Sequence, residues 1–192
     1  MNTKQNNSAK KVVFSAMFTA LTLIATYVIK IPTPTLGYIH IGDSFVILSS
    51  LFLGPLSGPL AAGLGSALSD LLGGYAIWVP GTFIIKFLSA LTCAALIRGL
   101  NKISPQSNSL STAKIAISGV AGELVMIVGY FFYNIIIISL LNGSFNTSAL
   151  SGAITESAAE IPFNIVQGTV GIILALILAP LTKRIVKDTY DK

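Results

Sequence analysis

The stretch that decides the fold runs from Tyr38 to Lys86 and reads YIHIGDSFVILSSLFLGPLSGPLAAGLGSALSDLLGGYAIWVPGTFIIK. It is mostly apolar and rich in small residues, and two Gly-Pro pairs and one Gly-Gly pair divide it. Its acidic, basic and histidine side chains are His40, Asp43, Asp70 and Lys86, and Trp78 is the only tryptophan of the chain. A soluble core does not need so much glycine, and a simple membrane anchor does not contain such charges. The stretch is typical of the substrate-handling part of a small membrane transport protein.

Composition extends this interpretation to the whole chain. Of the 192 residues, 53% are hydrophobic and 10% are charged, whereas soluble domains carry about 25% charged residues. We therefore expect one integral membrane domain over residues 1–192, embedded in the lipid bilayer. The net charge is +5, but no basic and aromatic motif for nucleic acid accompanies it. Cys93 is the only cysteine, which excludes an intrachain disulfide.

Six apolar runs predict the membrane-spanning helices, because a span needs about 20 largely apolar residues. They are residues 12–29, 41–54, 58–72, 81–100, 112–141 and 157–181. The first run is longer than the apolar core of a signal peptide, and we expect it to be retained. The second and third are short and predict a hairpin of two short helices joined at 54–59. Polar loops are expected at 101–111 and 142–156.

Basic residues predict the orientation of these helices. If both ends are cytoplasmic, then of the 12 basic residues only Lys30 lies in an outer loop, Lys86 lies well inside a span, and Arg98 and Lys114 lie at the inner ends of their spans. The others fall in the tails 1–11 and 183–192 or in inner loops, as the positive-inside rule requires. The sequence therefore predicts an all-α, six-transmembrane-helix bundle in the cell membrane, with both termini cytoplasmic.

Ionisable groups inside these spans are candidates for function, because each costs at least ~2.5–3.5 kcal/mol near the bilayer centre. Asp70 follows a row of small residues spaced by four, which predicts contact with protein rather than lipid. This row is Gly58, Ala62, Ser66 and Asp70. Asp70 and Lys86 are expected at similar depths on either side of a loop. They form an ion pair that pins two helices, or contact a ligand, and the two roles are compatible.

Two further polar stripes lie in the last spans. Glu160, Asn164 and Gln167 share one face of the last helix, and Glu123, Tyr130 and Asn134 share one face of the 112–141 helix. The first stripe predicts a ligand site or hydrogen bonds that hold helices together. In the second stripe, Glu123 is the deeper member with a structural role, while Tyr130 and Asn134 are better placed to meet a ligand.

Aromatic residues gather near the predicted outer boundary. They are Tyr38, Tyr75, Trp78 and Tyr133. Two interpretations stay open: an interfacial belt, or a wall on which a flat ligand stacks, with Tyr75 and Trp78 on a lid loop. His40 precedes Gly42 and Asp43 at a helix entrance. One histidine beside one carboxylate is too little for a metal site, so we expect no metal and a hydrogen-bonding role for His40.

The run from His40 to Lys86 resembles the S components of energy-coupling-factor (ECF) vitamin transporters. The resemblance is to the riboflavin-type superfamily and to its branches linked to vitamin B6 or to hydroxymethylpyrimidine. It covers nearly the whole chain and rests on I-G-D, the G-P turn, G-S-A-L-x-D and W-x-P-x-T-x-x-I-K. These motifs are specific to the superfamily and weaker on the identity of the ligand.

The resemblance implies a vitamin pocket near the outer face, covered by the loops after the first and third helices. It also implies partners: a transmembrane coupling subunit and two cytoplasmic ATPase subunits. The chain itself has no nucleotide-binding loop, which fits a binding subunit that relies on a partner for energy. The coupling surface of the family uses Ala-x-x-x-Ala on the first helix, matched here by Ala16 and Ala20. Ordinary packing within the bundle is the other explanation of this alanine pair.

We therefore expect a non-enzymatic S component that binds a small, flat heteroaromatic vitamin and needs no cofactor. A vitamin B6 vitamer (pyridoxine, pyridoxal or pyridoxamine) is favoured, hydroxymethylpyrimidine is next, and riboflavin or another small vitamin follows because the polar set is compact. The candidate substrate-binding residues are His40, Asp43, Asp70, Tyr75, Trp78, Lys86, Tyr130, Asn134, Glu160, Asn164 and Gln167.

Three other classes of function were weighed. The first is a stand-alone ion-coupled carrier, with Asp70, Glu123 and Glu160 as proton sites. The second is an intramembrane enzyme, for which no convincing Ser–His–Asp arrangement or metal cluster exists. The third is a structural scaffold, which the polar stripe on the last helix argues against.

Overall fold

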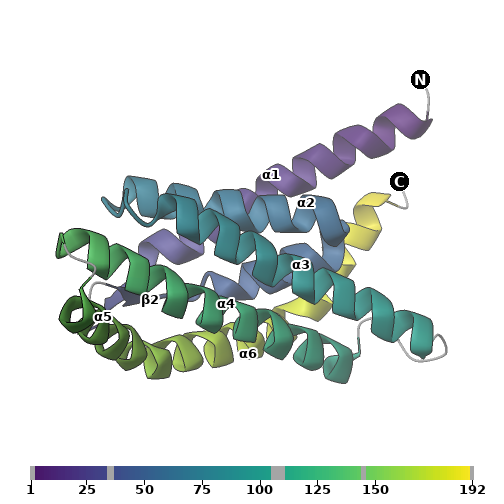
Figure 1. The fold of residues 1–192 in the computed structure, drawn as a ribbon. Coiled ribbons are helices and arrows are strands. Elements are labelled where there is room, and N and C mark those ends of the chain that lie inside the picture. Colours follow the sequence, from purple (N-terminus) through teal and green to yellow (C-terminus); the bar gives the residue numbers. More distant parts are fainter. Residues whose placement is uncertain (1–2, 34–36, 105–110, 144–145, 191–192) are drawn as a thin grey trace.

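The chain folds into a bundle of helices with one small β-hairpin (Figure 1). The computed structural model describes residues 3–33, 37–104, 111–143 and 146–190. In chain order the elements are α1 (Thr3–Val28), β1 (Ile31–Pro32), β2 (Tyr38–Ile39), α2 (Asp43–Leu72), α3 (Val79–Ile103), α4 (Thr112–Leu141), α5 (Thr147–Ala159) and α6 (Ile161–Tyr190). Within the described part of the chain, five stretches are long and apolar enough to cross a membrane: 8–28, 43–72, 79–103, 112–141 and 147–185.

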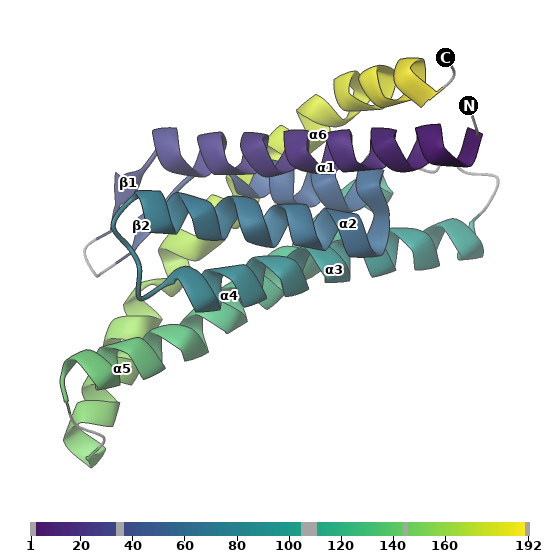
Figure 2. The same cartoon turned by 90° about the horizontal axis from the view of Figure 1, so that it is seen from above.

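Helix α2 reverses direction at Gly54. This residue has φ 78° and ψ −173°, a non-helical conformation with a positive φ that glycine adopts without steric cost. The hydroxyl of Ser49 donates to the carbonyl of Gly58 at 3.2 Å, and a Cβ on Gly58 would lie 2.5 Å from the carbonyl oxygen of Ser49. The two halves of α2, 43–53 and 55–72, therefore run back along each other (Figure 2). The predicted hairpin of two short helices is confirmed.

The first half of α2 forms the centre of the bundle, between α1, α3 and α6. Val46, Ile47 and Leu48 are each 0% exposed. Glycines let neighbouring helices approach α2 closely: a Cβ on Gly171 of α6 would lie 2.8 Å from the Cβ of Asp43. The predicted row of small residues also faces protein, since Gly58, Ala62, Ser66 and Asp70 are all buried.

The two ends of the bundle differ. The start of α1 and the end of α6 lie together at one end, which we call the terminal end, close to the bend at Gly54 (Figures 1 and 2). The opposite end carries the β-hairpin formed by β1 and β2 and the 73–78 loop, where Tyr75 contacts Tyr38. We call it the hairpin end, after this β-hairpin and not after the bend in α2. β1 and β2 are antiparallel, with Ile31 opposite Ile39. The predicted inner loop at 101–111 falls in part on residues 105–110, outside the described residues.

Two predictions of the boundaries were wrong. The 142–156 region is largely helical, because the side chain of Asn146 caps α5 by accepting from the backbone N–H of Ala149 at 2.9 Å. Helix α5 buries Ala153 and Ser157, and α6 begins only at Ile161 rather than at residue 157. Helices α1 and α6 extend into the stretches 1–11 and 183–192, whose place as cytoplasmic tails stays a prediction.

Candidate functional site

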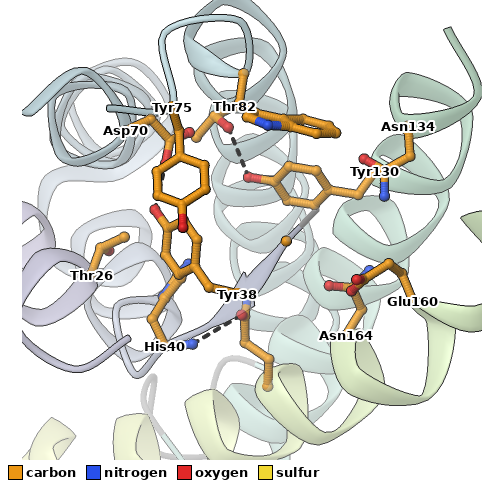
Figure 3. Close-up of a pocket in the computed structure, with 13 residues that line it drawn as sticks. Thr26, Tyr38, His40, Asp70, Tyr75, Thr82, Tyr130, Asn134, Glu160 and Asn164 are labelled. Carbon is orange, nitrogen blue, oxygen red and sulfur yellow. Dashed lines mark hydrogen bonds between the residues drawn. The ribbon is translucent and has the colours of Figure 1, made fainter. Parts of the chain in front are cut away.

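A cavity lies at the hairpin end, between β2, α4, α6 and the loop that joins α2 to α3. Its empty volume is about 550 Å³, a figure that includes the open space at its mouth. Figure 3 shows Tyr38 and Tyr75 on one side of this space and Tyr130, Asn134, Glu160 and Asn164 on the other. The lining residues are Thr26, Gly37, Tyr38, His40, Asp70, Tyr75, Trp78, Thr82, Tyr130, Asn134, Glu160, Asn164 and Gln167.

A buried ion pair supports the cavity. The ammonium of Lys86 on α3 donates to Oδ1 of Asp43 on α2, and both side chains are 0% exposed. Gln167 on α6 donates from Nε2 to Oδ2 of Asp43 at 2.7 Å, and its Oε1 accepts from the backbone N–H of His40 at 3.1 Å. The carboxylate of Asp43 thus joins α2 to α3 and α6, and Gln167 joins α6 to the backbone just after β2.

The predicted ion pair between Asp70 and Lys86 is wrong. Lys86 pairs with Asp43, because the first half of α2 lies in the middle of the bundle beside α3. Neither Asp43 nor Lys86 lines the cavity. Asp70 instead accepts a hydrogen bond at Oδ1 from the phenol of Tyr38.

The Tyr38 side of the cavity is an aromatic cluster, formed by Tyr27, Tyr38, Tyr75 and the ammonium of Lys30. The rings of Tyr38 and Tyr75 are 4.9 Å apart. The Nζ of Lys30 lies 4.4 Å from the centre of the Tyr38 ring and 5.1 Å from that of Tyr75, close enough for cation–π attraction. Burial raises the pKa of Tyr38, and nearby Asp70 raises it further. The phenol therefore stays protonated and donates.

A second aromatic group closes the cavity from α3 and α4. Trp78 lies edge-on to Tyr133, with ring centres 5.8 Å apart, and the phenol of Tyr133 donates to the carbonyl of Ile77 at 2.8 Å. Tyr130 donates from its phenol to Oγ1 of Thr82 at 3.2 Å (Figure 3). These contacts hold the rings in place, so aromatic side chains lie on two sides of the cavity. A wall on which a flat ligand stacks stays a prediction.

His40 is a neutral hydrogen-bond donor. Its Nδ1 accepts from the backbone N–H of Gly42 at 3.0 Å, which assigns the ring hydrogen of the neutral imidazole to Nε2. Burial lowers the pKa of His40 to about 3, against the opposing effect of Asp43. The structure holds no group of three or more His, Cys, Asp or Glu side chains suited to a metal ion within its described ranges.

The α6 side of the cavity is polar and includes an acid. Oε1 of Glu160 accepts from the hydroxyl of Thr33 at 2.5 Å, and Glu160 is 5% exposed. Asn164 lies one turn further along α6, and Asn134 faces the same space from α4 (Figure 3). Amide groups both donate and accept, so this side offers a ligand neutral donors, neutral acceptors and one carboxyl group.

Comparison with known proteins places this arrangement in a family. The family model described as "ECF-type riboflavin transporter, S component" matches residues 6–185. The chain belongs to this family of ECF S components. Members are substrate-binding transport proteins rather than enzymes, and the resemblance seen in the sequence is confirmed at this level.

One relative and two solved structures are also similar to this chain. An uncharacterised protein of Pyrococcus woesei is 32% identical over 108 residues, which are 56% of this chain and 66% of that protein. The S component of a bacterial ECF transporter has the same fold, with a TM-score of 0.63, 21% identity and coverage of 93% of this chain and 98% of that one. The S component for biotin from an ECF-type ABC transporter gives a TM-score of 0.61 at 19% identity, over 91% and 93% of the two chains.

Nearly all the predicted substrate-binding residues of this S component line the cavity. The exceptions are Asp43 and Lys86. Sequence reasoning missed Thr26, Gly37 and Thr82 and treated Tyr38 only as a boundary aromatic. Thr82 lies within the W-x-P-x-T motif, which is a usable signal, whereas nothing in the sequence marks Thr26 among the other polar residues of the first helix.

Two predicted roles lie outside the cavity. Ala16 and Ala20 are exposed on α1, so neither is consumed by packing within the bundle. Glu123 is 4% exposed, and neither of its carboxylate oxygens has a hydrogen-bond partner among the described residues.

Proposed function

We propose that this S component captures one small, flat heteroaromatic vitamin from the outer side of the cell membrane. The observation that carries the proposal is the cavity at the hairpin end, with aromatic side chains on two sides and hydrogen-bonding side chains on α6. Aromatic walls favour a planar ring by offset or edge-to-face stacking, each contact worth about 0.5–1.5 kcal/mol beyond burial. A few placed polar groups then fix the orientation of the ligand.

A vitamin B6 vitamer is our first candidate ligand, with hydroxymethylpyrimidine next. Their single ring with hydroxyl and ring-nitrogen groups matches the compact polar set formed by His40, Asp70, Glu160 and Asn164. Riboflavin is the third candidate, because the matching family model carries that vitamin in its description. Its larger ring system would stack on the same aromatic walls.

A fluorescence titration tests the capture of a vitamin. Trp78 is the only tryptophan and lines the cavity, so a bound ring should change its emission. Purified protein is titrated with pyridoxine, pyridoxal, pyridoxamine, hydroxymethylpyrimidine and riboflavin, and calorimetry on Trp78→Phe separates binding from quenching. Saturable binding of one of them is expected. If none binds, the proposed function is wrong.

Variants on two helices test the site. Asn164→Ala on α6 and Asn134→Ala on α4 each remove an amide that faces the cavity, and together they should weaken binding at least tenfold. The matched control is Asn142→Ala, which changes an exposed amide at the end of α4. Unchanged affinity in the Asn134/Asn164 double variant would reject the site while leaving capture of a vitamin intact.

The partners implied by the family are a transmembrane coupling subunit and two ATPase subunits. Both termini would then face the cytoplasm, which agrees with the basic residues of the terminal end. The exposure of Ala16 and Ala20 supports a coupling surface on α1, since small residues four apart admit a partner helix. Ala16→Trp and Ala20→Trp should abolish uptake and preserve binding. Loss of binding instead would place these alanines in internal packing.

A carrier that works alone is the competing class. Vesicles that contain only this protein discriminate the two: uptake without any ATPase, collapsed by an uncoupler, would favour ion coupling. The S component proposal expects no uptake until the coupling subunit and the ATPases are added.

A further inference from the structure

The charges around the cavity are unevenly distributed. Asp70 and Glu160 both line it, and no lysine or arginine does so among the described residues. Residues 34–36, which lie outside the described residues, are Pro, Thr and Leu, and none of them is charged. His40 also lines the cavity, and burial keeps it neutral at pH 7.

Both cations nearest to the cavity are already engaged. Lys86 is 0% exposed and paired with Asp43, and neither residue lines the cavity, so the charge of Lys86 is matched before any ligand enters. Lys30 lies within 4.4–5.1 Å of the centres of three tyrosine rings and is not part of the lining. Its charge offsets part of that of Asp70, which leaves Glu160 with no basic neighbour in the described contacts.

The remaining polar groups are neutral. Asn134, Asn164 and the Nε2–H of His40 offer hydrogen bonds without formal charge. Such groups serve hydroxyl, ring-nitrogen and carbonyl groups of a vitamin. A phosphate or carboxylate is usually recognised by arginine or lysine, and neither lines the cavity among the described residues. A helix N-terminus can also bind an anion; α6 begins at Ile161, directly after the lining residue Glu160, whose own carboxylate supplies the negative charge at that helix end. Carboxylates that line the cavity repel an anionic ligand, the more strongly as water is excluded.

From this arrangement we infer that the cavity selects neutral or cationic ring compounds and rejects the same compounds once they carry a phosphate or carboxylate group. The inference rests on the proposed function and narrows its substrate class. It assigns Glu160 and Asp70 as specificity-determining residues. The vitamin in its free form is the substrate, and its phosphate ester is excluded.

Matched pairs of ligands test the selectivity. Riboflavin is compared with riboflavin 5′-phosphate, and pyridoxine with pyridoxine 5′-phosphate, by calorimetry on the purified protein at pH 7.5. The phosphate ester should bind at least a hundredfold more weakly than its parent. A phosphate ester that binds within tenfold of its parent overturns the inference and leaves the proposed function intact. If no member of either pair binds, and neither do the other vitamins named above, the proposed function and the inference both fail.

Charge removal tests the mechanism of this selectivity. Glu160→Gln keeps an acceptor for the hydroxyl of Thr33 and removes one acid, and Asp70→Asn does the same opposite Tyr38. Each should reduce the preference for the free vitamin over its phosphate at least fivefold, even if overall affinity falls. Glu156→Gln on α5 is the matched control, because Glu156 is not part of the lining. An unchanged preference in both Glu160→Gln and Asp70→Asn would overturn the assignment.

Discussion

Replacing Lys86 by methionine tests the most buried charge interaction of the molecule. Methionine fills a similar volume and removes the ammonium, which leaves the carboxylate of Asp43 at 0% exposure with only Gln167 to donate to it. Removing one partner of a buried pair costs about 3–5 kcal/mol, because the other charge stays buried and unmatched. At about 2–4 °C per kcal/mol for a chain of this size, Lys86→Met should lower the Tm by about 6–20 °C.

The second variant in this experiment is the double replacement Asp43→Asn with Lys86→Met. It removes both charges and should recover most of the lost stability, because a buried pair is often no better than neutral side chains of similar shape. Thermal unfolding in one detergent, read by tryptophan emission, measures both variants. Lys102→Met, at an exposed position of the same helix, should change stability by less than about 0.5 kcal/mol.

Two results would refute this reasoning. One is a Lys86→Met protein whose stability lies within about 1 kcal/mol of the native protein, well below the cost of an unmatched buried charge. The other is rescue of Lys86→Met by Asp70→Asn instead of Asp43→Asn, which would show that Asp70 is the partner of Lys86 after all.

Three further substitutions have expected outcomes. Gly42→Ala should destabilise the protein by about 1–3 kcal/mol in thermal unfolding, because a Cβ there would overlap Oγ1 of Thr26; an unchanged Tm would show that α1 gives way easily. Glu123→Gln should be neutral or stabilising, since neither carboxylate oxygen has a partner among the described residues, and a loss above about 1 kcal/mol would reveal a partner for the charge. Burial holds the pKa of His40 at about 3, below the value of about 6.5 in an unfolded chain. Below pH 6.5 the unfolded chain therefore takes up a proton that the folded protein does not. The free energy of unfolding is unaffected above pH 6.5 and falls by about 1.4 kcal/mol per pH unit as the pH drops toward 3. His40→Gln should therefore flatten the decline of Tm between pH 6.5 and 5, and an equally steep decline would contradict a neutral buried imidazole.

Several features of the fold were predictable because they depend on local chemistry. The reversal at Gly54 needs a positive φ, which glycine adopts without steric cost, and the proline that follows disfavours a continuous helix there. The Gly-Pro pair therefore predicts the reversal. The buried face that ends at Asp70 follows from small residues at four-residue spacing. The polar stripe of α6 follows from helical periodicity alone. None of these requires knowledge of which helix lies beside which.

The partner of Lys86 was predicted wrongly because it depends on how the helices are arranged around one another. Position along the chain predicts the depth of a side chain, and it predicts similar depths for Asp70 and Lys86. It does not predict the direction in which each helix face points within the bundle, and that direction brings Asp43 to Lys86. The α5 region was missed because serine, threonine and asparagine resemble a loop by composition. Its helix depends on the Asn146 cap and on tertiary burial of Ala153 and Ser157.

The polar stripe of α6 left two interpretations open, a ligand site or hydrogen bonds that hold helices together, and the contacts divide it between them. Gln167 uses both ends of its amide within the protein: it donates to Asp43 and accepts from the backbone of His40. It therefore joins α6 to α2 and to the chain just after β2. Glu160 and Asn164 lie closer to the hairpin end and face the cavity. Gln167 is therefore the structural member of the stripe, and Glu160 and Asn164 are the members that a ligand would meet. Under the selectivity that we propose, selection among ligands depends on Glu160 and Asp70, which line the cavity, rather than on Lys86, which is paired with Asp43 and does not line it.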